Sequence, residues 1–116
     1  MINLRVKIKT GDCLDLQNSI FCALSENIME LHYVDFYNIT HLIKRLKDRS
    51  YNSTMFDPFK SSGKPSVFRI NINEANSYRV LMMMESVIWE DIYLATLHRE
   101  LVEQIDRQTM EIKKFN

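Results

Sequence analysis

The chain of 116 residues contains only two glycines and two prolines. An all-β domain needs many tight turns, and these two residue types are the main formers of such turns. Their scarcity therefore argues against an all-β fold. It also leaves almost no means of bringing backbone close to a phosphate group, and the chain has no glycine-rich phosphate loop. The length corresponds to a single domain over residues 1–116.

The chain has no net charge, because 15 basic side chains balance 15 acidic ones. A general attraction to nucleic acid or to an anionic membrane is therefore not indicated, although a local basic face stays open. Cys13 and Cys22 are typical of free thiols in a reducing compartment. No apolar run reaches membrane-spanning length. Basic residues interrupt the first ten positions, which a signal peptide would fill with an apolar segment, so we expect none. We expect a cytoplasmic protein without a membrane partner.

Signatures of catalysis and metal binding are absent as well. The three histidines, His32, His41 and His98, form no His-x-x-x-His pair, and the cysteines lack zinc-ligand spacing. There is no serine nucleophile elbow and no Cys–His motif. We therefore expect no enzymatic activity, no metal and no cofactor.

Two segments alternate as strands do. Residues 2–9 place apolar side chains on one face and Asn or basic side chains on the other, and residues 67–72 repeat this alternation. Helical spacing follows in 13–31 and in 38–49, with Asp12 and Asn38 as expected N-caps. Residues 50–66 hold both prolines and one glycine, and they predict a loop that separates two halves of the chain.

The last third of the chain, from Asn73 to Lys113, has no glycine or proline and shows helical spacing throughout. As one helix it would be about 60 Å long, whereas a domain of this size is only about 27 Å across. We expect a break near residues 89–91, and Asn73 as the first N-cap. Each half of the chain, before and after the expected loop at 50–66, then has the predicted order strand-helix-helix, which would be a pseudo-repeat. The predicted fold is α+β and mostly helical, with two short strands, helices on one face of them and a long C-terminal helical segment.

Residues 81–94 are apolar around nearly the whole helix circumference. Such a helix is buried on all sides, and a short chain has little to cover it with. A homodimer is the simplest partner; the alternative is a central core helix covered by the N-terminal half. The predicted dimer interface consists of Met84, Val87, Ile88, Leu94, Leu97, Leu101 and Ile105.

Aromatic side chains in and beside the polar loop suggest a second contact surface. Tyr51, Phe56 and Phe59 lie among polar residues, where they either anchor the loop or bind a partner. Seven methionines add adaptable apolar surface. These features favour a small non-enzymatic binding protein, an adaptor or inhibitor acting by protein–protein interaction, in the style of proteins that phages and mobile elements encode.

An alternative function involves nucleic acid. Residues 39–51 resemble the recognition helix of winged helix-turn-helix regulators, and residues 63–70 resemble the returning strand of the wing. The resemblance implies a DNA-binding transcriptional regulator, with recognition-helix residues at the bases and wing residues on phosphates. The implied contacts are Asn38, Thr40, His41, Lys44 and Arg45, with Lys60 and Lys64 on the wing. A solvated amphipathic helix would carry the same basic residues.

Overall fold

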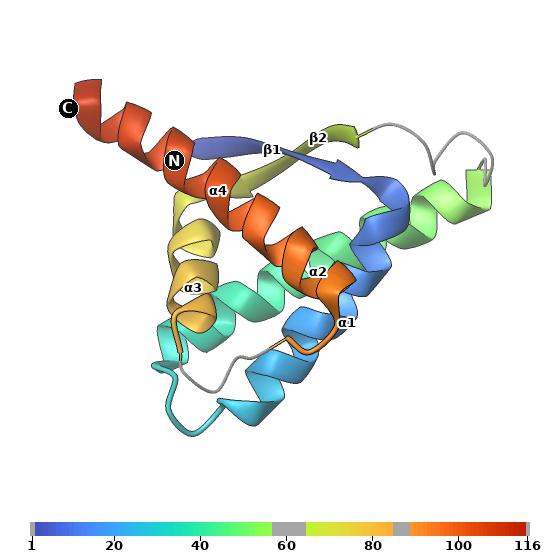
Figure 1. Ribbon diagram of the computed structural model, residues 1–116, viewed down its shortest axis with the longest axis horizontal. Coiled ribbons are helices and arrows are strands. Elements are labelled where there is room, and N and C mark those ends of the chain that lie inside the picture. Colours follow the sequence, from blue (N-terminus) through green and yellow to red (C-terminus); the bar gives the residue numbers. More distant parts are fainter. Residues whose placement is uncertain (1, 57–64, 85–88, 116) are drawn as a thin grey trace.

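The computed structural model describes residues 2–56, 65–84 and 89–115, and for 51–56 and 113–115 it describes the backbone alone. Two strands and four helices are described, in the order strand-helix-helix twice over (Figure 1). This confirms the expected fold class, an α+β protein that is mostly helical. The elements are β1 (Asn3–Lys9), α1 (Thr10–Glu26), α2 (Tyr33–Phe56), β2 (Pro65–Asn71), α3 (Ile72–Met82) and α4 (Ile92–Phe115).

The two strands pair antiparallel, with Val6 opposite Phe68 and Leu4 opposite Ile70. These four side chains point to one face and are buried, while the alternate residues of both strands are exposed. The predicted alternation therefore holds, and it sets which face of the sheet is dry. Helices α1, α2 and α3 lie beneath the sheet, and α4 runs beside β1 (Figure 1).

The helix boundaries differ from those expected at several points; for example, α1 ends at Glu26 and not at 31, and α3 ends at Met82, before the expected break near 89–91. Helix α1 begins at Thr10, so that Lys9 precedes it and Asp12 lies in its first turn. Helix α2 begins at Tyr33 and continues to Phe56, so that the first part of the expected loop is helical. Asn38 therefore lies inside α2 and does not cap a helix. Its side-chain amide instead donates a hydrogen bond to Ser77 Oγ (3.0 Å).

The expected break in the C-terminal segment is confirmed between α3 and α4. The N-cap of α3 is Asn71 and not Asn73. Glu74 N–H donates to Asn71 Oδ1 (2.7 Å), and Asn71 N–H donates to Glu74 Oε1 (3.0 Å), which completes a capping box. Helix α4 starts after Asp91, whose Oδ1 accepts from the N–H of Tyr93 at 2.8 Å.

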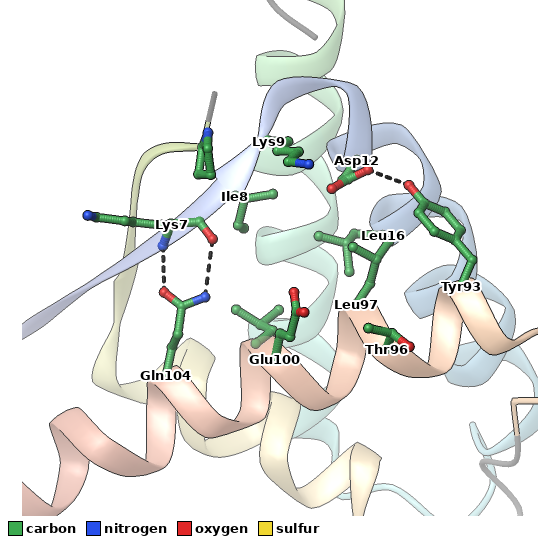
Figure 2. A pocket seen from close by; sticks show the side chains of 12 residues that line it. Lys7, Ile8, Lys9, Asp12, Leu16, Tyr93, Thr96, Leu97, Glu100 and Gln104 are labelled. Carbon is green, nitrogen blue, oxygen red and sulfur yellow. Dashed lines mark hydrogen bonds between the residues drawn. The ribbon is translucent and has the colours of Figure 1, made fainter. Parts of the chain in front are cut away.

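Both edges of the sheet are closed by side chains of the long helices. On the β1 edge, Gln104 bonds the backbone N–H (2.7 Å) and carbonyl (3.1 Å) of Lys7 (Figure 2). Gln108 bonds the same groups of Arg5 (2.9 and 2.6 Å). On the β2 edge, the carbonyl of Arg69 accepts from Arg45 and that of Val67 from Arg49, at 3.2 Å for the latter. A strand edge would otherwise offer these groups to another chain.

The described helices include none with the length and apolarity that crossing a membrane requires.

Candidate functional site

One apolar hollow lined by described residues is a groove between α1 and α2. Its cavity volume is about 530 Å³. Phe21 of α1 and Ile28, just after the end of that helix, line one wall. Phe36 and Ile43, seven residues apart on one side of α2, line the other. The full lining, called the α1/α2 groove below, is Gln17, Phe21, Leu24, Ser25, Ile28, Phe36, Thr40, Ile43, Lys44 and Lys47.

The α1/α2 groove is apolar but open to solvent. Phe21 is 55% exposed, Ile28 49% and Phe36 37%. More than half of the large exposed apolar side chains of the described residues fall between positions 14 and 37; they are Leu14, Phe21, Ile28, Met29, Tyr33, Val34, Phe36 and Tyr37. Single exposed apolar residues are ordinary, whereas contiguous apolar surface is typical of interaction sites, and three of these residues, Phe21, Ile28 and Phe36, line the same groove.

The charge of the groove has one sign. Lys44 and Lys47 are its charged lining residues, and both are exposed on α2. Neither ammonium group forms an ion pair within the described part of the chain. The groove therefore offers an apolar floor with an unneutralised basic rim.

A second cavity of about 270 Å³ lies where β1 and α1 meet α4 (Figure 2). Its apolar side chains include Ile8, Leu16 and Leu97, with Asp12 and Glu100 among its polar ones.

Across the end of this cavity, the Tyr93 hydroxyl donates to Asp12 and lies 3.1 Å from Asp15 Oδ2. Partial burial, together with the hydrogen bonds to both carboxylates, raises the pKa of the Tyr93 phenol above its usual range. This contact fastens α4 to α1 and explains the two aspartates structurally. This contact was not predictable from the sequence, because the residues lie far apart along the chain.

A buried polar cluster joins α1, α3 and α4 at His98, which is 2% exposed. Its Nε2 lies 2.8 Å from Ser19 Oγ, its Nδ1 lies 2.7 Å from the Tyr78 hydroxyl, and Trp89 stacks on its ring at 4.3 Å. Burial lowers the pKa of His98 to about 4. The neutral tautomer with its proton on Nε2 satisfies both contacts, since Tyr78 then donates to Nδ1 and Ser19 accepts.

The pairing of Ser19 with His98 is not a nucleophilic site. The Ser19 hydroxyl donates its own proton to the Leu16 carbonyl (3.1 Å) and is buried, so that no substrate reaches it. A serine nucleophile must instead give its proton to the histidine. The cluster is a satisfied polar element of the core, and the sequence had indicated only an isolated histidine.

The residues implied by the winged-helix resemblance are partly engaged inside the molecule. Arg45 forms an ion pair with the buried carboxylate of Glu74 at 2.6 Å, and His41 Nδ1 lies 3.0 Å from the same group. Asn38 bonds Ser77, and Thr40 Oγ1 donates to the Phe36 carbonyl (2.8 Å). Lys44 lies on the rim of the α1/α2 groove. Lys60 and Lys64 lie outside the described residues.

The strand expected to return from a wing, β2, pairs instead with the N-terminal strand β1. On this side of the protein, sequence reasoning missed the capping box of Glu74 with Asn71 and the ion pair of Glu74 with Arg45. The signal was present in the Asn-x-x-Glu spacing from Asn71 to Glu74, which is that of a capping box.

The face expected to form a dimer seam packs largely on the protein's own core. Leu101 is 3% exposed and Ile105 1%, because α4 lays these side chains against the buried face of the sheet and its helices. A second copy could not reach them, which corrects their assignment to a seam. Met84, Leu94 and Leu97 are half-buried. Val87, Ile88 and Phe59 lie outside the described residues, as do the side chains of Tyr51 and Phe56.

Within the described ranges, no three His, Cys, Asp or Glu side chains are placed to hold a metal ion together. No protein-family model matches the chain, and neither a curated protein nor a solved structure matches it. The case for function therefore rests on the geometry of these surfaces.

Proposed function

We propose that this protein is a non-enzymatic binding protein, an adaptor or inhibitor, that takes an acidic amphipathic helix of a partner protein into the α1/α2 groove. The observation that carries the proposal is the exposed apolar floor of Phe21, Ile28 and Phe36 beneath a rim of Lys44 and Lys47. A helix bound in a groove presents apolar side chains at i, i+3 or i+4 and i+7. Acidic residues beside that stripe would neutralise the two lysines.

The energetics suit such an occupant. Completing the burial of a large apolar side chain contributes up to about 1.5–3 kcal/mol, and each of the three floor residues is still about half exposed. The rim lysines contribute less to affinity than to orientation and to the choice of partner, since exposed ion pairs are weak. A basic or neutral helix would make the same apolar contacts but would lack the favourable charge contacts with Lys44 and Lys47 that orient and select an acidic helix.

The test compares two synthetic helical peptides that share one apolar stripe and differ in having acidic or basic flanking residues. We expect the acidic peptide to bind more tightly, with NMR shift changes confined to the α1/α2 groove. Phe21→Glu with Phe36→Glu should weaken it at least tenfold, whereas Met110→Glu, at an exposed apolar site on α4, should not. Equal binding of both peptides, or shift changes elsewhere, would overturn the proposal.

A second copy of the chain is the other occupant to consider, since a homodimer remains a prediction. Sedimentation of the wild type and of the Phe21→Glu, Phe36→Glu variant distinguishes the two. A dimer that the variant dissociates would assign the groove to self-association instead of to a partner. DNA binding by α2 has less support from the geometry, because Arg45 and Asn38 are held by Glu74 and Ser77.

A further inference from the structure

The exposed face of the two-stranded sheet is basic. Arg5, Lys7 and Lys9 project from β1 and Arg69 from β2, and all four residues are exposed. Neither strand contains an acidic residue. We call these four side chains the basic sheet face. It is a local concentration of positive charge in a chain whose net charge is zero.

Two of these cations directly oppose each other. Arg5 is the partner of Arg69 across the antiparallel ladder. Like charges directly opposite destabilise such a pair. Among the described residues neither guanidinium has an ion-pair partner, although other arginines of this protein do, such as Arg45 with Glu74 and Arg79 with Asp106. The arrangement lacks a counter-charge that a bound polyanion would supply.

Strand addition does not account for this surface. Gln104 and Gln108 occupy the outer backbone groups of β1 at Lys7 and Arg5, and Arg45 and Arg49 occupy carbonyls of β2. A peptide or a second copy therefore finds no free edge at these positions to extend the sheet. The part of the sheet that stays accessible to a partner is the basic sheet face, which carries positive charge.

We propose that the basic sheet face binds the phosphate backbone of double-stranded nucleic acid, an activity separate from peptide binding by the α1/α2 groove. From Arg5 to Lys9 the face spans roughly 13 Å at about 3.3 Å per residue. Duplex DNA carries about one negative charge per 1.7 Å of its axis, so that this span meets several phosphates. The described strand residues of this face include no aromatic side chain, which a platform for single-stranded bases would need.

The site differs from the one that the winged-helix resemblance implies, because it uses the sheet and not α2. It also makes a quantitative prediction about salt. Each neutralised phosphate contributes about −0.9 to the slope of log K against log salt concentration, so that four contacts give a slope of about −3.6. Removing two of them should halve the slope.

The experiment is fluorescence anisotropy of the full chain with a short labelled duplex DNA of mixed sequence, between about 50 and 200 mM salt. The variant Arg5→Gln with Arg69→Gln should bind at least tenfold more weakly at low salt, with a slope near −1.8. The matched control, Lys44→Gln with Lys47→Gln, removes the same charge from the α1/α2 groove and should leave DNA binding within twofold of the wild type.

Both variants are expected to fold, since all four residues are exposed, and circular dichroism checks this. A duplex RNA of the same sequence shows which double helix is preferred, and tight binding of either one supports the proposal. Absence of duplex binding at low salt, equal weakening by both variants, tighter binding of single strands, or binding of phosphatidylserine vesicles in place of nucleic acid would each overturn it. Peptide binding by the groove is measured separately, so that either activity can fail alone.

Discussion

The side-chain amide of Gln104 hydrogen-bonds the backbone of Lys7 as a neighbouring strand would. It accepts from the Lys7 N–H and donates to the Lys7 carbonyl. Gln108, one turn further along α4, does the same for Arg5. The four-residue rise of a helix, about 6 Å, nearly matches the two-residue rise of a strand, about 6.6 Å. A helix thereby completes the hydrogen bonding of a two-stranded sheet.

The change Gln104→Glu tests this pairing. A carboxylate still accepts from the Lys7 N–H but cannot donate, so that it faces the Lys7 carbonyl oxygen without a proton between them. We expect the free energy of unfolding to fall by about 1–2 kcal/mol in urea titrations. Glu103→Gln, at the adjacent exposed position, is the control and should change stability little. Equal stabilities of the two variants would show that the glutamine contact is incidental.

The buried imidazole of His98 predicts a loss of stability in mild acid. Its pKa in the folded protein is about 4, below the ordinary value of 6.5. Above pH 6.5 the residue is neutral in both states and its contribution is fully present. As the pH falls from 6.5 to 4, the unfolded chain takes up a proton that the folded protein excludes, and stability falls by about 3 kcal/mol.

Below pH 4 this residue causes no further loss, because both states are then protonated. NMR titration of the His98 ring, combined with unfolding curves at each pH, checks the prediction. A pKa near 6.5 in the folded protein would contradict it. The variant His98→Gln should show a flatter profile over the same range of pH, even if its stability is lower throughout.

The carboxylate of Glu74 is expected to matter more than that of any exposed glutamate. It is 1% exposed, caps α3 through Asn71 and pairs with Arg45. Glu74→Ala removes the cap and leaves the Arg45 guanidinium without its partner. We expect a loss of about 3 kcal/mol or more in thermal or urea unfolding. Glu111→Ala, on the exposed side of α4, should stay within about 0.5 kcal/mol of the wild type.

Leu101→Glu separates the core role of α4 from a dimer role. The side chain is 3% exposed within its own chain, so a carboxylate there would be buried without a partner. We expect the monomer to unfold, seen as loss of the cooperative transition in circular dichroism. Met110→Glu, at a position 72% exposed on the same helix, should fold normally. A folded Leu101→Glu protein with only its sedimentation changed would restore the seam that the sequence suggested.

Sequence reasoning located most of the fold because the alternation in 2–9 and 67–72 and the break near 89–91 are local signals. It misplaced the start of α2 because the aromatic segment from Tyr33 to Tyr37 has no clear apolar stripe; four of its five residues are exposed. It also assigned Leu101 and Ile105 to a second copy. An apolar helix face shows that something covers it, but spacing alone cannot distinguish a neighbouring strand of the same chain from a partner.

The candidate site was harder to foresee for the same reason. The α1/α2 groove depends on how two helices cross, and its residue Phe21 looks like an ordinary core position in the sequence. Arg45 looked free because its partner, Glu74, lies 29 residues away. The basic face of β1 was visible from alternation, but its opposition to Arg69 needed the register of the sheet.

The pairing of α4 with β1 also determines when the edge of β1 is covered during synthesis of the chain. Gln108 lies 103 residues after Arg5, so that β1 leaves the ribosome long before the helix whose side chains bond its outer edge. Until then the nascent chain carries a strand with an open edge and an uncovered core, the state in which chains associate wrongly. The outer hydrogen bonds of β1 are thus completed only after α4 has been synthesised, and until then the edge of this strand is open to association with other chains.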